Sequence, residues 1–291
     1  GMSRTLLLLF SLPSCDSEPH VRRARARSPL QANKTMHLYY ETFGLGHPLI
    51  ILHGLFGTQE NWRTLSKNFG QHFQVFALDQ RNHGRSPHST VFTYEAMAVD
   101  IREFMQEHAL PSAYLLGHSM GGKVAMRFAI TYPNLVDKLV VVDIAPKGYP
   151  PGHDDVCASL YALNLPTLRS RQDADADLAQ YLPDLALRQF LLKNLERTES
   201  GTFRWRINLN GIRDNYHEML KGFDLTRTYT KPTLFIKGSD SGYIKENDFV
   251  TMREIFPRAQ LVTIPGTGHW VHAEAPQEFA RTVITFLTSQ T

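Results

Sequence analysis

The 291-residue chain has two cysteines, Cys15 and Cys157, and it lacks any long uninterrupted apolar run. Because Cys157 is the single cysteine beyond the first 31 residues, no disulfide can form within the body of the chain, which argues against a secreted, disulfide-stabilised protein. The longest early apolar stretch, Leu6 to Phe10, falls well short of the roughly 18–20 residues that a membrane-spanning helix needs. We therefore expect no transmembrane segment.

The formal net charge is +3, but most of the chain has no excess of charge of either sign. Residues 1–31 hold five arginines and two acidic residues, so the other 26 basic and 26 acidic residues cancel. The high isoelectric point thus describes a basic leader on a neutral body, and it gives no indication of nucleic-acid binding.

The leader, residues 1–31, combines the apolar run Leu6 to Phe10 with the run Arg-Arg-Ala-Arg-Ala-Arg and little acid. This composition is typical of a mitochondrial presequence, and it predicts a mitochondrial protein, with a cytoplasmic location as the alternative. A disordered tail and a secretory signal are the other interpretations.

From residue 36 onward, short apolar runs alternate with helical patterns, and 42% of the whole chain is apolar. Continuous apolar strands are buried on both faces, which indicates an α/β fold with a mostly parallel sheet flanked by helices. The expected strands are 37–42, 49–52, 75–78, 113–116, 139–142, 233–236 and 261–264, and the expected helices include 94–108, 121–132 and 276–287.

One long stretch, residues 147–229, contains no convincing buried strand and shows helical patterns such as Leu178 to Leu195. Crossover connections rarely need about 80 residues, so we expect this stretch to be a helical cap inserted into the core. The predicted organisation is a leader (1–31), a core (32–146 and 230–291) and the cap (147–229).

The segment Gly117-His118-Ser119-Met120-Gly121 contains the candidate nucleophile. Gly-x-Ser-x-Gly alone is weak, since chance supplies roughly 0.1 matches in a chain of this length. Here the motif follows an apolar strand and precedes a helix, which is the setting of a nucleophile elbow. Glycines are expected on either side because side chains there would collide with the neighbouring strand and helix. We therefore predict that Ser119 is a catalytic nucleophile.

A serine hydroxyl needs a base to take its proton, and His269, in a glycine loop after the last strand, is the candidate. His272 is its close competitor, whereas His53 and His83 lie in His-Gly turns typical of structural positions. An acid must then orient the imidazole. Asp143 and Asp240 both follow strands and qualify, while the surroundings of Asp79 suggest a loop-bracing role.

Backbone amides must also hold the oxyanion that forms during acyl transfer. Met120, directly after the nucleophile, is expected to supply one N–H, and Leu55, in His53-Gly54-Leu55-Phe56-Gly57, the other. The pocket candidates are apolar or aromatic: Leu55, Phe56, Met120, Tyr149 and Trp270. They favour an uncharged, hydrophobic acyl group.

Together these motifs resemble the α/β-hydrolase fold family, over nearly all of residues 36–291. The matching segments are His-Gly-Leu-Phe-Gly, Asp-Gln-Arg-Asn-His-Gly-Arg-Ser, Gly-His-Ser-Met-Gly-Gly-Lys, Val-Asp-Ile-Ala-Pro and Gly-His-Trp-Val-His-Ala-Glu. They are similar to a branch that holds small bacterial carboxylesterases and a mitochondrial diacylglycerol lipase/esterase. Many members place the acid in Gly-x-x-Asp after the seventh strand, where this chain has Ser241. The branch that it resembles places the acid after the sixth strand, which implies Asp143.

The resulting hypothesis is a serine hydrolase that cleaves carboxylic esters of uncharged, lipid-like substrates through an acyl-enzyme. Thioester or C–C bond hydrolysis is an alternative, because the same triad serves both, and a non-catalytic receptor on this fold is another. Ser119 excludes the aspartate-nucleophile chemistry of dehalogenases and epoxide hydrolases. We expect no cofactor and no metal, a small-molecule ester as the partner, no nucleic acid, and a monomer or weak dimer.

Overall fold

The computed structural model describes residues 35–152, 154–224 and 226–290, and the predicted leader lies outside these residues. Its centre is a seven-stranded sheet with the order β1-β3-β2-β4-β5-β8-β9. The strands are β1 (Tyr40–Phe43), β2 (Pro48–Leu52), β3 (Gln74–Leu78), β4 (Ala113–His118), β5 (Val136–Val142), β8 (Thr233–Gly238) and β9 (Ala259–Ile264). Strand β1 pairs antiparallel with β3, and the other neighbours pair in parallel. The expected mostly parallel sheet is confirmed.

The first strand differs from its prediction, because pairing begins at Tyr40 rather than at His37. Its partner β3 ends at Leu78, which faces Tyr40 in the register, so the three preceding residues have no opposing strand residue to pair with. An edge strand is paired on one side alone, and periodicity does not show where such pairing stops.

The strands are continuously apolar because helices cover both faces of the sheet. Leu49 and Ile51 of β2 face a core shared with α1 and α11, whereas Ile50 and Leu52 face a second core shared with α2 and α3. The helices of the core are α1 (Arg63–Phe69), α2 (Tyr94–Glu107), α3 (Met120–Thr131), α9 (Asp248–Ile255), α10 (Val271–Glu274) and α11 (Pro276–Thr288). Short 3-10 helices cover Gln59–Trp62 and Pro133–Leu135.

Residues 147–229, called the cap segment below, are inserted between β5 and β8. They contain α4 (Asp154–Ala162), a 3-10 turn (Leu165–Thr167), α5 (Arg171–Leu178), α6 (Leu185–Leu192), the hairpin β6 (Leu195–Arg197) and β7 (Phe203–Trp205), α7 (Leu209–Asp214) and α8 (Tyr216–Met219). A single helical pattern from Leu178 to Leu195 was the wrong interpretation. Pro183 cannot continue a helix, and the Asp184 side chain caps a new one by accepting from Ala186 N at 2.8 Å.

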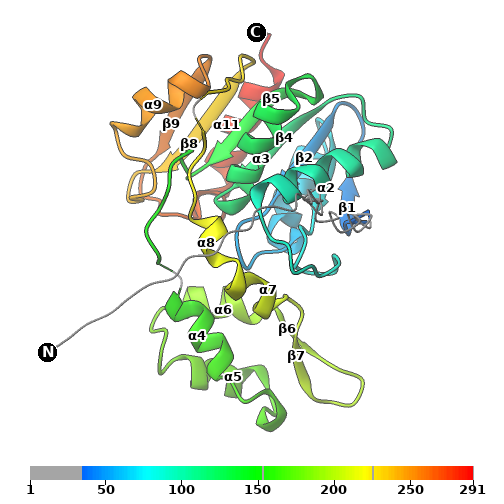
Figure 1. Cartoon of the computed structure of the whole chain (residues 1–291), viewed down its shortest axis with the longest axis vertical. Coiled ribbons are helices and arrows are strands. Elements are labelled where there is room, and N and C mark those ends of the chain that lie inside the picture. The colour runs from blue at the N-terminus through cyan, green and yellow to red at the C-terminus, as the bar shows by residue number, and fades with distance from the viewer. Residues whose placement is uncertain (1–34, 153, 225, 291) are drawn as a thin grey trace, which may run out of the picture. The chain divides into compact units, whose positions relative to one another are not determined.

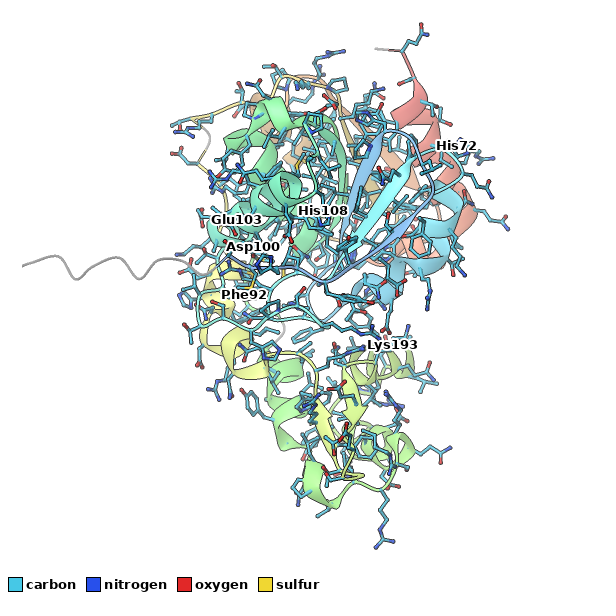
Figure 2. All side chains as sticks on the ribbon, turned by 90° about the vertical axis from the view of Figure 1, so that its right-hand side faces the viewer. His72, Phe92, Asp100, Glu103, His108 and Lys193 are labelled. Atoms are coloured by element: carbon cyan, nitrogen blue, oxygen red, sulfur yellow. The ribbon has the colours of Figure 1, made fainter. Side chains whose placement is uncertain are left out.

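Figure 1 shows α4, α5, α6 and the β6–β7 hairpin gathered below the sheet, with α8 between them and the core. The view turned by 90° in Figure 2 shows the same separation, with Lys193 of the cap segment below Asp100 and His108 of the core. The interior of the cap segment is apolar, and Leu160, Leu178 and Leu191 belong to the same buried cluster as α2 and α3. None of the helices in the described ranges is long and apolar enough to cross a membrane.

Candidate active site

Ser119 lies at the sharp turn between β4 and α3. Its backbone has φ 52° and ψ −117°, a strained conformation for a residue with a side chain. The turn is held because Ser119 N donates to Val142 O at 3.0 Å and Lys123 N donates to Ser119 O at 3.0 Å. The strain exposes the Oγ at the carboxyl edge of the sheet, as a nucleophile elbow requires.

The glycines around Ser119 are required by close backbone approach. A Cβ on Gly117 would lie 2.1 Å from Gly121 O, and a Cβ on Gly121 would lie 2.3 Å from Leu52 O. Both contacts are with backbone atoms that cannot move aside. The expectation that side chains here would collide with the neighbouring strand and helix is confirmed.

Ser119, His269 and Asp143 come from three loops and lie in one line of hydrogen bonds. His269 Nε2 lies 3.0 Å from Ser119 Oγ, and His269 Nδ1 lies 2.7 Å from Asp143 Oδ2. A carboxylate only accepts, so the Asp143 contact places the imidazole proton on Nδ1 and leaves Nε2 as the acceptor of the serine proton. The geometry is that of a nucleophile, a base and an orienting acid.

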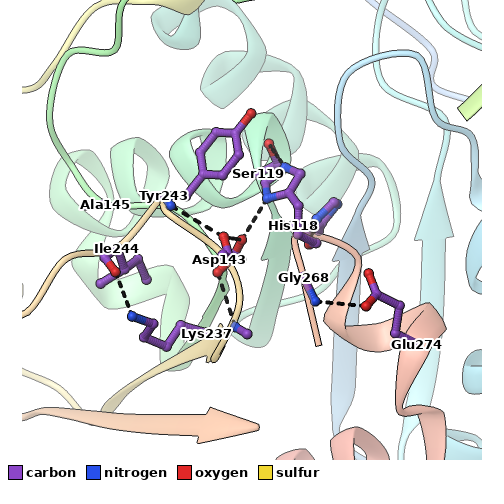
Figure 3. A network of polar contacts seen from close by, with 12 residues as sticks. His118, Ser119, Asp143, Ala145, Lys237, Tyr243, Ile244, Gly268 and Glu274 are labelled. Carbon is purple, nitrogen blue, oxygen red and sulfur yellow. Dashed lines mark hydrogen bonds and ion pairs between the residues drawn. The ribbon is translucent and has the colours of Figure 1, made fainter. Parts of the chain in front are cut away.

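The Asp143 carboxylate is fully buried and receives hydrogen bonds from three sides. Besides His269, the amide of Gly238 donates to Oδ1 at 3.2 Å, and the hydroxyl of Ser241 donates to Oδ2. A buried charge is costly unless it is hydrogen-bonded, and these donors supply that compensation. Figure 3 shows Asp143 close to Ser119 and Tyr243, with the Lys237–Ile244 and Gly268–Glu274 contacts bracing the loops around them.

The competing acid, Asp240, is not brought to His269. Its side chain is exposed and accepts from Ser239 Oγ at 2.9 Å, while its amide donates to Thr267 O at 2.9 Å. The neighbouring residue Ser241 points inward instead. Asp240 therefore shapes the loop that carries Ser241.

Two aromatic side chains around His269 were missed by the sequence reasoning. The Tyr243 ring stacks on the His269 ring with centroids 3.9 Å apart and planes 19° from parallel. His118 Nε2–H donates to the His269 carbonyl at 2.9 Å. This hydrogen bond joins the loop that carries His269 to the residue before Ser119. His118 stands in the serine motif, which could have drawn attention to it, whereas no local pattern singles out Tyr243.

The two expected oxyanion donors lie at the ends of loops that the structure holds firmly. Among the described residues, neither Leu55 N nor Met120 N donates to a protein acceptor. Phe56, with φ 64°, is pinned on both sides, because its N–H donates to His83 Nε2 at 3.1 Å and its carbonyl accepts from Asn194 Nδ2 at 2.7 Å. Asn194 belongs to the cap segment, so the cap segment contacts the loop that carries Leu55.

His53 and His83, which were expected to be structural, are buried, and so is His272, the competing candidate for the base. His53 Nε2 accepts from Gln80 N at 3.0 Å, and the His272 ring stacks on Trp62 with centroids 4.2 Å apart. Burial lowers the pKa of His83 to about 4 and that of His272 to about 3, so both are neutral near pH 7. Asp79 braces its loops by accepting from the amides of Gln59 and Arg85.

A cavity of about 730 Å³ lies over Ser119, between the core and the cap segment. Its walls include His269 and the pocket candidates of the sequence analysis: Leu55, Phe56, Met120, Tyr149 and Trp270. The cap segment contributes Leu187 and Phe190. In the described ranges, no group of three or more histidine, cysteine or acidic side chains is arranged to hold a metal ion.

A model of the alpha/beta hydrolase fold matches residues 47–276, which is most of the chain. The chain belongs to the α/β-hydrolase fold family. It is 38% identical over 285 residues to the sn-1-specific diacylglycerol lipase ABHD11 of Danio rerio, covering 94% of this chain and 89% of the relative. It is 40% identical over 240 residues to a putative esterase/lipase of Haemophilus influenzae, covering 82% of each. A marine microorganism esterase of solved structure has a TM-score of 0.84 and 41% identity, covering 86% of this chain and 99% of that one.

Proposed function

We propose that this member of the family is a serine hydrolase that cleaves carboxylic esters through an acyl-enzyme, with Ser119, His269 and Asp143 as its catalytic residues. The observation that carries the proposal is the line of hydrogen bonds from Ser119 Oγ through His269 to Asp143, beside two backbone amides that have no acceptor among the described residues. Relatives of 38–40% identity that are named as a lipase and an esterase support the reaction class.

In the first half-reaction, Ser119 Oγ attacks the ester carbonyl carbon while His269 Nε2 takes the hydroxyl proton. The carbonyl electron pair moves to its oxygen, and the N–H groups of Leu55 and Met120 hold the resulting oxyanion. The C–O bond to the alcohol then breaks, and His269 returns its proton to the departing alcohol oxygen. This leaves an acyl group on Ser119.

In the second half-reaction, water replaces the alcohol and follows the same path. His269 takes a proton from water, the hydroxyl oxygen attacks the acyl carbon, and the serine oxygen leaves with the proton that His269 returns. Asp143 orients the imidazole and stabilises its charged form in both halves. The products are a carboxylic acid and the free enzyme.

We further propose that the substrate is a lipid-like ester and that residues 147–229 act as a cap over the site. The cavity walls given by Leu187, Phe190 and Trp270 are apolar, and a volume of about 730 Å³ accommodates a large acyl group. Apolar walls favour long chains because each methylene buried contributes about 0.8 kcal/mol. The name of the lipase relative points to acylglycerols.

The proposal is tested with a series of p-nitrophenyl esters from acetate to palmitate. We expect turnover by the wild-type chain that rises from acetate to longer acyl groups, and a loss of roughly 10⁶-fold in kcat for Ser119→Ala, as in other serine triads. A wild-type protein that binds these esters without hydrolysing them would instead be a receptor. Faster cleavage of matched thioesters or C–C substrates would favour those alternatives.

The basic leader supports a separate proposal, that residues 1–31 direct the protein to mitochondria. A fusion of residues 1–34 to a fluorescent protein should accumulate in mitochondria, and a version with the arginines of residues 22–27 changed to glutamine should remain in the cytosol. Equal distribution of the two fusions would argue for a tail without targeting function.

A further inference from the structure

Lys123 is a buried lysine on α3, one helical turn after Ser119, and it lines the cavity over the nucleophile. It is 1% exposed to solvent. Its backbone is part of the elbow, but the mechanism above gives its side chain no task. A buried charge at a reaction site therefore needs an explanation.

The Lys123 ammonium has few partners. Within the described part of the chain, its Nζ donates one hydrogen bond, to Lys221 O at 2.6 Å, and no carboxylate lies within ion-pair distance. The rings of Tyr94 and Tyr149 face it, with centroids 5.5 Å and 4.9 Å away. Aromatic faces attract a cation but accept no strong hydrogen bond. An ammonium has three donors, so two of them are left for another acceptor.

Two other lysines show how this protein satisfies partly buried ammonium groups. Lys138 Nζ donates to the carbonyls of Phe286, Leu287 and Ser289. Lys147 also lines the cavity, and its Nζ pairs with Asp248 at 2.6 Å. Among the residues that the structure describes, Lys123 has neither a cage of carbonyls nor a carboxylate.

This arrangement is costly for the empty site and favourable once an anion is bound. Burial lowers the pKa of Lys123 to about 8, so the group is still mostly protonated at pH 7. Removing a charge from water without a partner is unfavourable, and a carboxylate in the cavity would supply both the missing charge and hydrogen-bond acceptors.

We propose that Lys123 is a specificity-determining residue that binds a carboxylate carried by the substrate, separate from the ester that Ser119 attacks. The proposal rests on ester hydrolysis at Ser119, and it replaces the expected uncharged substrate by one with an apolar body and one anionic group. Ser119 and Lys123 line the same cavity, so one substrate can present its ester to the serine and its carboxylate to the lysine.

The test compares substrates that differ in one charge. Monoethyl glutarate and monoethyl adipate carry a carboxylate on the acyl arm, and their monoamides are nearly isosteric and neutral. The butyrate ester of 3-hydroxypropanoate and its amide place the same difference on the alcohol arm. On one of these two arms, the wild type should have a higher kcat/KM for the carboxylate than for the matching amide. Lys123→Gln should lower the ratio of these two kcat/KM values roughly 10- to 100-fold.

Lys123→Arg keeps the charge and should retain most of the ratio, whereas Lys138→Gln, which changes a lysine outside the cavity, should leave it unchanged. A ratio that is the same in wild type and Lys123→Gln, on both arms, overturns the proposal. Hydrolysis of ethyl butyrate by the wild type reports on the proposed function separately. If Lys123→Gln fails to fold, the proposal is tested by inhibition of ester hydrolysis by the wild type. Glutarate should inhibit more strongly than glutaramate, and equal inhibition overturns the proposal.

Discussion

Ser241 donates its hydroxyl hydrogen to Asp143 Oδ2, the same carboxylate oxygen that accepts from His269. Ser241 occupies the position where many members of the family carry the acid itself. Here the proposed acid, Asp143, follows β5, and Ser241, after β8, donates a hydrogen bond to it. The carboxylate is thereby held in the orientation that His269 needs.

Replacement of Ser241 tests this support. Ser241→Ala removes a hydrogen bond to a buried carboxylate, and we expect kcat to fall about 5- to 30-fold, the equivalent of about 1–2 kcal/mol, with little change in KM. Ser239→Ala, two residues earlier on the exposed side of the loop, is the matched control. The kcat values of the two variants are compared by steady-state kinetics with one p-nitrophenyl ester. Equal effects of the two substitutions would mean that Ser241 acts only on loop stability.

The choice of acid is tested by a pair of isosteric substitutions. Asp143→Asn should lower kcat about 10⁴-fold, because an amide does not fix the proton on His269 Nδ1 in the way that a carboxylate does. Asp240→Asn should change kcat less than about threefold, since its side chain is exposed and accepts a hydrogen bond from the neighbouring Ser239. A collapse of activity in Asp240→Asn alone would reverse the assignment.

Asn194 links the cap segment to the loop that carries Leu55 and Phe56. Its amide holds the carbonyl of Phe56, so Asn194→Ala should loosen the peptide that follows Leu55 and lower kcat roughly 10-fold, with less effect on KM. Asn208→Ala is the control, because Asn208 also joins the cap segment to the core, but through Asn82. A parallel rise in KM for both variants, without a kcat effect specific to Asn194, would indicate only a weakened cap.

The buried histidines predict how stability depends on pH. The pKa values of about 4 for His83 and about 3 for His272 lie below the ordinary value of 6.5. Between pH 6.5 and these values the unfolded chain binds protons that the folded chain does not, so stability is complete above pH 6.5 and falls as the pH decreases. Each such histidine contributes a slope of about 1.4 kcal/mol per pH unit.

Chemical denaturation from pH 7 to pH 4.5 measures this slope. His272→Phe keeps a ring against Trp62 and removes a buried Nδ1 that has no partner in the described residues. It should reduce the slope of the unfolding free energy against pH by the contribution of one histidine. His88→Asn, on the surface, serves as the control. A slope that His272→Phe leaves unchanged would show that His272 is not held neutral by the fold.

Much of the core could be predicted from sequence because buried parallel strands are continuously apolar. Val75 to Leu78 and Thr233 to Ile236 each lie within a strand of the structure. The cap segment was harder, since its short helices lack a long period, and Pro183 divides what the pattern of leucines presents as one helix. The hairpin of Leu195–Arg197 and Phe203–Trp205 has strands too short for alternation to reveal.

Of the candidate site residues, some could likewise be predicted from sequence and others could not. Ser119 and His269 stand in motifs with local geometric requirements, and sequence alone indicated them. The choice between Asp143 and Asp240 depends on which carboxylate points inward, and that is decided by packing between β5 and β8. The positions of Tyr243, Asn194 and the buried Lys123 side chain depend on long-range contacts, which have no signature in the local sequence.

Covalent labelling shows which residue is the nucleophile. The wild-type chain is treated with a fluorophosphonate at pH 7.5, and the modified peptide is identified by mass spectrometry. We expect one adduct, on the Oγ of Ser119, with a labelling rate that falls by orders of magnitude in His269→Ala. An adduct on another residue, or unchanged labelling of the Ser119→Ala variant, would contradict it.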